Sequence, residues 1–197
     1  MHDEKAHLGE SPEHVFETAK LGLWTFLATE VLLFGGLFTA YIMFRLEYPD
    51  LFHTEFQKLN RYLGLLNTLI LITSSLTIAM GIASIRRGKQ VMSRICIALT
   101  ILLAFGFLVV KYVEWSEDFA HGLYPGTNMF FSLYFMMTGL HGLHVAAGIC
   151  VLCTVLVMSF RGRFSPEYAT PVEISGLYWH FVDLVWIYLF PLFYLVA

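Results

Sequence analysis

Charged residues are scarce in this sequence. Only 14% of the 197 residues are Asp, Glu, Lys or Arg, and 57% are hydrophobic. A typical soluble domain is about 25% charged and about 45–50% apolar. With a mean hydropathy of +0.67, these values exclude an ordinary soluble domain and indicate a membrane protein. The net charge of −3 gives no sign of a basic surface for nucleic acid.

Cysteine is also rare. The three cysteines, Cys96, Cys150 and Cys153, all lie in apolar runs, so no disulfide framework is indicated. Cys150 and Cys153 match the C-x-x-C spacing of some redox and metal sites. Small cysteines inside an apolar helix usually serve packing, so we expect no redox role here.

The sequence has no apolar core near its N-terminus. The first residues, MHDEKAHLGESPEHVFETAK, are polar and acidic, unlike a secretory signal peptide, which carries an apolar region of 7–15 residues. We therefore expect membrane insertion to depend on internal helices.

Long apolar runs are what the sequence does contain. A helix needs about 20 mostly apolar residues to cross a bilayer, and five segments qualify. The loops between them are too short for a soluble domain, and no internal repeat is evident. We predict an all-α membrane bundle in a single transmembrane domain, residues 21–197, preceded by a polar segment, residues 1–20. The predicted spans are about 21–44, 62–85, 95–115, 129–160 and 174–197.

The basic residues are unevenly distributed between the two ends of these spans. The loop at 86–94 carries four of them and no acid, and its side of the membrane totals eight Lys and Arg against four on the other. The eight are Lys5, Lys20, Arg86, Arg87, Lys89, Arg94, Arg161 and Arg163, and the four are Arg45, Lys58, Arg61 and Lys111. By the positive-inside rule, we predict the N-terminus inside and the C-terminus outside.

Glu30 interrupts the first span and has no basic residue within nine positions on either side. An ionised carboxylate at such a depth costs about 2.5–3.5 kcal/mol on insertion scales. It is either a protonated, hydrogen-bonded structural acid or a proton-exchanging group near internal water. The stripe of Asn67, Ser74 and Gly81 in the second span offers a partner face suited to close helix contact. Gly35 and Gly36 suit close helix contact in the first span.

Two further stretches place polar side chains inside the bilayer. In TGLHGLHV, His141 and His144 are three residues apart and share a helix face, with flanking glycines that indicate close helix approach. Imidazole suits Zn, Cu and haem iron, but no thiolate or carboxylate cluster accompanies this pair. In YWHFVD, His180 and Asp183 have the same spacing, and we expect them to satisfy each other as an internal polar clamp. No complete metal site or nucleophile triad is indicated.

Several of these stretches together resemble a known family. GLHGLHVAAG and YWHFVDLVWI resemble signature stretches of subunit III of haem–copper oxidases, such as cytochrome c oxidase. LATEVLLFGGLFTAY is similar to the family helix with a buried glutamate, LLNTLILITSSLTIAMG to the next helix, and GLYPGTNMFF to the loop before the His-rich helix. The resemblance covers residues 21–197, and five spans resemble the short bacterial form.

The resemblance implies a subunit without a redox centre in an aerobic respiratory complex of the bacterial plasma membrane. Haem and copper are then held by subunits I and II, which transfer electrons from reduced cytochrome c to O2 with proton pumping. Subunit III packs against subunit I, holds phospholipids in a cleft and supports proton uptake. The family's buried polar residues carry over onto Glu30, His141, His144, His180 and Asp183. No catalytic, cofactor-binding or metal-binding residue carries over onto this chain.

The basic residues after the fourth span are candidates for lipid contact. Arg161 and Arg163 are predicted to lie at the inner surface, where anionic head groups attract each cation by about 1 kcal/mol. The alternative is that such residues only set the topology, which we favour for the 86–94 cluster.

Other functions stay open at this point. A quinol oxidase subunit III resembles the chain equally well, as does a protein associated with nitric oxide reduction, although glutamate at position 30 favours the cytochrome c type. An independent transporter or proton channel built on Glu30, His180 and Asp183 is a different class, but it lacks the paired broken helices of many transporters. The sequence names neither the electron donor, the lipid species nor a supercomplex partner, and it gives no role to residues 1–20.

Overall fold

The computed structural model describes residues 12–165 and 168–196, which are helical almost throughout. Five of the helices are long and apolar enough to cross a membrane, which confirms the predicted all-α architecture. A short pair of turns, α2 and η1, follows the first long helix. The elements are α1 (Pro12–Glu47), α2 (Pro49–Glu55), η1 (Phe56–Lys58), α3 (Arg61–Arg86), α4 (Gln90–Ala120), α5 (Met129–Phe160) and α6 (Thr170–Tyr194).

Local sequence signals explain where the helices begin and end. Asn60 and Asn128 accept hydrogen bonds from backbone N–H groups in the first turns of α3 and α5, as N-cap residues do. Gly88 and Gly162 follow the ends of these helices with φ of 73° and 68°, a conformation that favours glycine and stops a helix. The expected boundary at residue 20 falls inside α1, and residues 1–11 of the expected polar segment lie outside the described residues.

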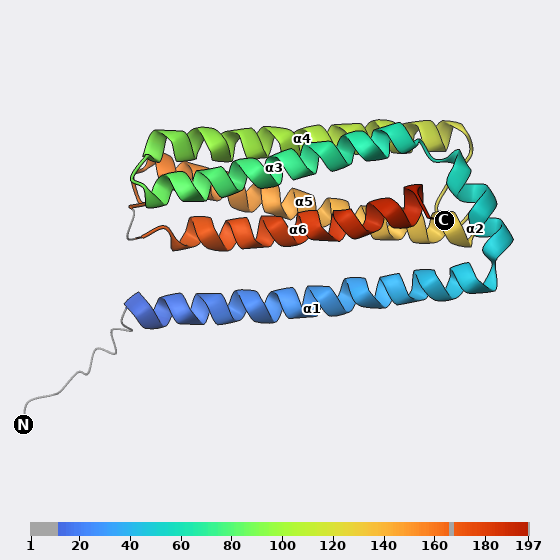
Figure 1. Cartoon of the computed structure of the whole chain (residues 1–197), viewed down its shortest axis with the longest axis horizontal. Helices are drawn as coiled ribbons and strands as arrows, with labels where there is room; N and C mark the ends of the chain where they lie inside the picture. The colour runs from blue at the N-terminus through green and yellow to red at the C-terminus, as the bar shows by residue number, and fades with distance from the viewer. Residues whose placement is uncertain (1–11, 166–167, 197) are drawn as a thin grey trace, which may run out of the picture.

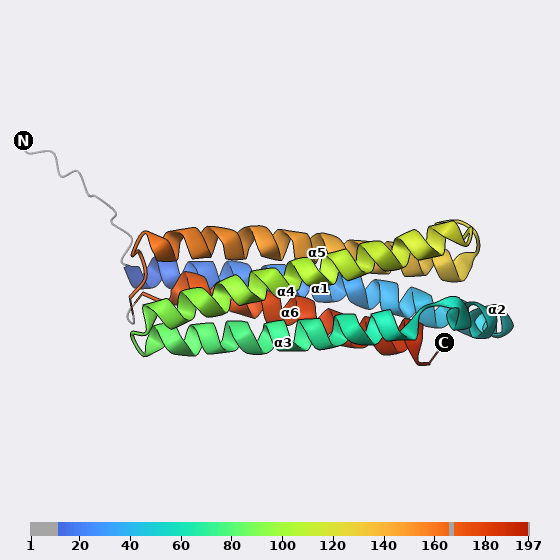
Figure 2. The same ribbon diagram turned by 90° about the horizontal axis from the view of Figure 1, so that it is seen from above.

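Helices α3 to α6 form a bundle, and α1 lies along one side of it. Figures 1 and 2 show α1 beside α6 and α5, with α2 crossing the end of the molecule to reach α3. In the apolar 18-residue stretch of α6 that could span a membrane, 50% of the residues are buried. In the corresponding stretch of α1, 17% are buried. Helix α6 is therefore the centre of the fold, and α1 is its most peripheral long helix.

The polar stripe of α3 packs inside the bundle and does not meet Glu30. Ser74 accepts a hydrogen bond of 3.0 Å from Trp179 Nε1 in α6, and the nearest atom to an added side chain at Gly81 is Cβ of Cys96 in α4, at 3.3 Å. The partner face proposed for Glu30 is therefore wrong. Small residues on α3 instead let α4 and α6 approach closely.

Only some of the expected glycine contacts are found. Among the described residues, no atom outside the local helix backbone lies within 4 Å of a Cβ added at Gly35, Gly36 or Gly142, so these glycines serve no close approach to another described helix. An added Cβ at Gly139, in the TGLHGLHV motif, would meet the ring of Trp115 in α4 at 3.3 Å, and one at Gly148 would meet the ring of Trp179 in α6 at 2.8 Å. The motif therefore allows α4 to approach closely at Gly139, whereas the tight packing of α6 on α5 lies at Gly148, just beyond the motif.

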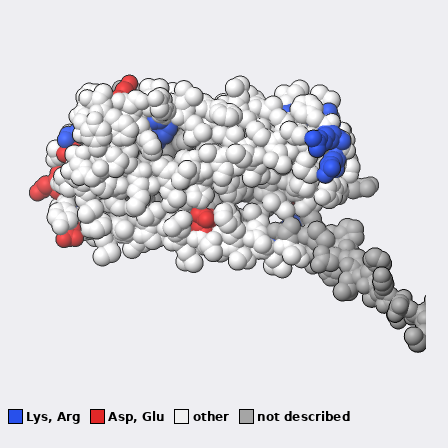
Figure 3. Space-filling model, turned by 180° about the vertical axis from the view of Figure 1, so that it is seen from behind, with Lys and Arg blue, Asp and Glu red and all other residues white. Residues whose placement is uncertain are grey.

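Charge is concentrated at the two ends of the molecule. Figure 3 shows Lys and Arg gathered at one end and most Asp and Glu at the other, with a largely uncharged face between them. The start of α1 lies at the same end as the α3–α4 loop (Figure 1). A long, largely uncharged belt between two charged ends is the pattern expected of a membrane-spanning bundle.

Candidate functional site

The partner of Glu30 is His144. Glu30 Oε2 in α1 lies 2.9 Å from His144 Nε2 in α5, and each side chain is 13% exposed. The other ring nitrogen, Nδ1, lies 2.8 Å from the carbonyl oxygen of Leu140. Tyr178 in α6 donates its hydroxyl to the His144 carbonyl at 3.0 Å, so three helices meet at this pair.

The geometry fixes how protons are arranged at the pair. A carbonyl oxygen only accepts hydrogen bonds, so the Nδ1 atom of His144 carries a proton. One further proton then lies between Nε2 and the Glu30 carboxyl group. Whether the carboxyl or the imidazole holds it, the pair has no net charge, which lowers the cost of keeping it inside the bilayer.

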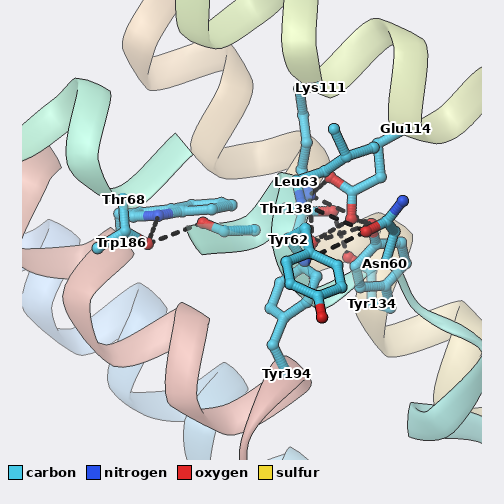
Figure 4. Close-up of polar contacts among 11 residues, drawn as sticks. Asn60, Tyr62, Leu63, Thr68, Lys111, Glu114, Tyr134, Thr138, Trp186 and Tyr194 are labelled. Carbon is cyan, nitrogen blue, oxygen red and sulfur yellow. Dashed lines mark hydrogen bonds and ion pairs between the residues drawn. The ribbon is translucent and has the colours of Figure 1, made fainter. Parts of the chain in front are cut away.

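A second buried acid–base cluster joins α4, α5 and α6, and we call it the lysine cluster: Lys111, Glu114, Tyr134 and Tyr194 (Figure 4). Lys111 Nζ donates to Glu114 Oε2 at 2.9 Å, to Tyr194 OH at 2.7 Å and to Tyr134 OH at 3.1 Å. Both tyrosine hydroxyl groups lie within hydrogen-bond distance of Glu114 Oε1, at 3.0 and 2.5 Å.

The lysine cluster is closed on itself. An ammonium group has three donors, and all three of Lys111 are used. The four side chains are buried, and the ammonium group also lies 5.0 Å from the ring centre of Trp186. A buried ion pair with its hydrogen bonds satisfied holds its helices in one arrangement, because removing either partner leaves an uncompensated charge.

The expected clamp between His180 and Asp183 does not form. His180 Nδ1 instead lies 2.7 Å from Ser75 Oγ in α3, because Ser75 approaches it from the neighbouring helix. The buried carboxyl group of Asp183 interacts with the same Ser75 side chain.

His141 and His144 do not act as a pair. His141 is fully buried between the rings of Phe107 and Trp186, at centroid distances of 5.5 and 5.2 Å. Neither of its ring nitrogens has a hydrogen-bond partner among the described residues. Within the described part of the chain, no three His, Cys, Asp or Glu side chains are grouped so that they could hold a metal ion.

Arg161 and Arg163 are exposed just beyond the end of α5. The neighbouring Arg94 donates to Ser159 Oγ at 3.3 Å and lies 5.3 Å from the ring centre of Phe160. The start of α4 therefore contacts the end of α5, next to the exposed Arg161 and Arg163.

Sequence reasoning missed the lysine cluster. Lys111 was assigned to the outer surface as a topological charge, but it is buried in α4. The spacing of Lys111 and Glu114, three apart on a helix, was the available signal for an ion pair. The two tyrosines come from other helices, and no local pattern connects them to this pair.

Comparison with known proteins agrees with the motifs. The family model for cytochrome c oxidase subunit III matches residues 1–197. The cytochrome c oxidase subunit 3 of Thermostichus vulcanus is 37% identical over 178 residues, covering 90% of this chain and 87% of that protein. The quinol oxidase subunit 3 of Bacillus spizizenii is 32% identical over 200 residues, covering 100% of this chain and 97% of that protein.

A third relative is a longer protein. The haem–copper oxidase subunit I+III of Aeropyrum pernix is 34% identical over 180 residues, covering 88% of this chain but only 22% of that protein. Subunits I and III are thus parts of one chain in that organism. The subunit III family carries no metal centre of its own. The chain belongs to the cytochrome c oxidase subunit III family, whose members are subunits of haem–copper oxidase complexes.

Proposed function

We propose that this chain is the non-redox subunit III of an aerobic respiratory oxidase that transfers electrons from cytochrome c to O2 and pumps protons. In this role it stabilises subunit I, binds phospholipid and supports proton uptake, in a complex that also contains subunit II. The observation that carries the proposal is the match of the whole chain to the subunit III family. The fused relative supports subunit I as the main partner.

Cytochrome c is the electron donor in this proposal. Glutamate rather than aspartate at position 30 favours the cytochrome c type, as the family resemblance implies. A quinol oxidase is the second candidate, because the Bacillus spizizenii relative aligns with the full length of this chain. The transporter alternative loses its support, since the chain belongs to a family of oxidase subunits.

The Glu30–His144 pair is the proposed proton-related group. It shares one proton between two side chains that are each 13% exposed, so the pair lies near the surface of the bundle. A partly exposed, hydrogen-bonded pair of a carboxyl group and an imidazole is suited to exchanging a proton with water or with a partner subunit. His141, His180 and Asp183 serve as buried polar contacts in this proposal.

The charged ends support a placement in the bacterial plasma membrane with the N-terminus inside. The α3–α4 loop lies at the same end of the molecule as the start of α1 (Figure 1), and Arg161 and Arg163 are exposed just beyond the end of α5. In this orientation both arginines meet the anionic inner leaflet, where they bind phospholipid head groups.

Purification through a tag on this chain, in a mild detergent, tests the proposal. The optical spectrum of the product and its oxidation of reduced cytochrome c and of a quinol are measured. Haem, copper and cyanide-sensitive oxidation of cytochrome c are expected to copurify, whereas an untagged strain carried through the same steps yields none. If the product oxidises quinol but not cytochrome c, quinol is the electron donor. A chain that purifies from fresh membranes without colour and without partner subunits contradicts the proposal.

A further inference from the structure

A groove runs between α3 and α6, which are neighbours in the bundle (Figures 1 and 2). Two hollows of about 370 and 320 Å³ lie along the groove and share Ala79 and His180. Leu76 and Ile187, which are 60% and 50% exposed, line the smaller hollow. The groove is therefore open to the outside of the bundle, where a membrane protein meets lipid.

Three polar side chains in contact with one another line the smaller hollow. His180 Nδ1 lies 2.7 Å from Ser75 Oγ, and the Ser75 side chain also interacts with the buried carboxyl group of Asp183. The other ring nitrogen of His180, Nε2, has no hydrogen-bond partner among the described residues. The imidazole is thus held through Nδ1 and has Nε2 left for a ligand.

The depth of His180 restricts what that ligand is. His180 lies 10 residues after Thr170, the first residue of α6, which is about 15 Å along the helix axis. The hydrocarbon layer is about 30 Å thick, so the imidazole lies deep within it. A phospholipid keeps its head group at the surface, and its acyl chains carry no hydrogen-bonding atom at this depth. The ligand therefore dissolves in hydrocarbon and brings its own polar atom inside.

A quinone has these properties, because it combines an apolar tail with a flat ring that carries two oxygen atoms. An imidazole nitrogen either donates to a carbonyl oxygen or accepts from a hydroxyl group, depending on the tautomer. His180 Nε2 therefore suits both the quinone and the quinol form of such a ring.

The walls of the groove also suit a flat ring. The small side chains of Ala79 and Ala83 leave space along α3, and the Trp186 ring lines the deeper hollow. Aromatic rings pack favourably on one another. Sites for small molecules are typically clefts of about 300–1,000 Å³, mostly apolar and with a few placed polar groups, which describes both hollows.

We propose that the groove between α3 and α6 binds the ring of a membrane quinone or quinol, with one ring oxygen hydrogen-bonded to His180 Nε2. Ser75 and Asp183 hold the imidazole in position, and the ring lies against Ala79. Binding alone is proposed, and it goes beyond the proposed function because it does not depend on whether cytochrome c or a quinol donates the electrons.

Photoaffinity labelling of the intact complex tests this site. The probe is an azidobenzoquinone with a decyl tail, and the labelled peptides of this chain are identified by mass spectrometry. We expect label on α3 and α6 that excess decylbenzoquinone displaces and decanol, which has the tail without the ring, does not. Equal displacement by decanol would identify a groove for acyl chains and overturn the proposal, as would an intact complex without label on these helices. The haem content of the same sample reports separately on the proposed function.

Two matched substitutions fill or spare the groove. Ala79→Leu enlarges an exposed residue that lines both hollows, and Ala98→Leu makes the same change at an exposed position of α4 outside them. We expect Ala79→Leu to abolish the displaceable label and Ala98→Leu to leave it unchanged. Equal labelling of the two variants contradicts the site.

His180→Phe tests the hydrogen bond to the ring oxygen. The change keeps an aromatic ring and removes Nε2, so the concentration of decylbenzoquinone that halves the labelling should rise about tenfold. An unchanged concentration in a complex of normal haem content would show that His180 does not bind the quinone.

Discussion

The bundle contains two acid–base contacts of opposite character. In the lysine cluster, Lys111 and Glu114 have side chains that are 6% and 1% exposed, and every ammonium donor is used within the chain. The Glu30–His144 pair joins the peripheral helix α1 to α5 through one hydrogen bond, and each side chain is 13% exposed. The bundle therefore has one acid–base contact within a closed hydrogen-bond network and one at its edge.

This difference predicts a structural role for the lysine cluster and is consistent with the proposed proton-related role of the edge pair. Many hydrogen bonds from three helices converge on the lysine cluster, so any change there disturbs the packing of α4, α5 and α6. The edge pair rests on a single hydrogen bond between α1 and α5, so a change there disturbs fewer contacts. Substitutions at the two contacts should therefore affect different properties of the complex.

The largest effect is expected from Lys111→Met. It leaves the Glu114 carboxylate buried without a cation, which typically lowers stability by about 3–5 kcal/mol. We expect little chain in membranes and a marked drop in the thermal unfolding midpoint of what is purified. Lys58→Met is the control, because its ion pair with Glu55 is half exposed on the lysine side and should contribute at most about 1 kcal/mol. Similar stability of both variants would show that the lysine cluster does not stabilise the packing of α4, α5 and α6.

A smaller effect is expected from Tyr194→Phe. The change removes the hydroxyl that contacts both Lys111 and Glu114, and hydrogen bonds to charged groups contribute about 1.5–3 kcal/mol. The thermal midpoint of the complex should fall while the chain still accumulates. Tyr188→Phe, at an exposed position of the same helix, should stay within about 0.5 kcal/mol of wild type. An equal response from the two tyrosines would contradict the closed network.

Glu30→Gln should alter stability by less than about 1 kcal/mol, because the amide retains a hydrogen bond to His144 and the pair carries no net charge. Glu30→Leu is the comparison, since it leaves the imidazole without a partner and should cost about 1–3 kcal/mol. Thermal unfolding of the purified complexes measures both. If Glu30→Gln lowers the thermal unfolding midpoint as much as Lys111→Met does, the edge pair has a structural role as well.

The smallest effect is expected at the basic end, where contacts are exposed to solvent and lipid. Replacing Arg161 and Arg163 together with Ala should reduce the phospholipid that copurifies, at about 1 kcal/mol per charge, without changing the thermal midpoint. Mass spectrometry of the bound lipid gives the result. Arg87→Ala serves as the control from the adjoining loop, and an unchanged lipid content in the double variant argues against the proposed lipid role.

The helices were predictable from sequence because each one is specified by its own composition. A segment such as 62–85 carries no charge and is long enough to span a bilayer, so its neighbours are not needed to identify it. The helix ends differ from the predicted spans because hydropathy detects apolar content, whereas α4 continues through polar residues to Ala120.

The contacts between helices were not predictable in the same way. Glu30 and His144 are separated by 114 positions, and nothing local to either residue identifies the other. The three-residue spacing wrongly predicted a contact between His180 and Asp183, because Ser75 from α3 hydrogen-bonds to the imidazole instead. Lys111 was misplaced because a charge near the end of an apolar run is usually at the surface, whereas here two tyrosines from other helices surround it.

The most direct test is the number of turnovers that intact oxidase completes before it inactivates, measured side by side for Glu30→Gln and Tyr194→Phe. If the edge pair supports proton uptake and the lysine cluster is structural, Glu30→Gln shortens this catalytic lifetime at normal thermal stability. Tyr194→Phe then keeps a normal lifetime per intact complex despite its lower stability. A normal lifetime for Glu30→Gln, or a shortened one for Tyr194→Phe alone, would contradict this division of roles.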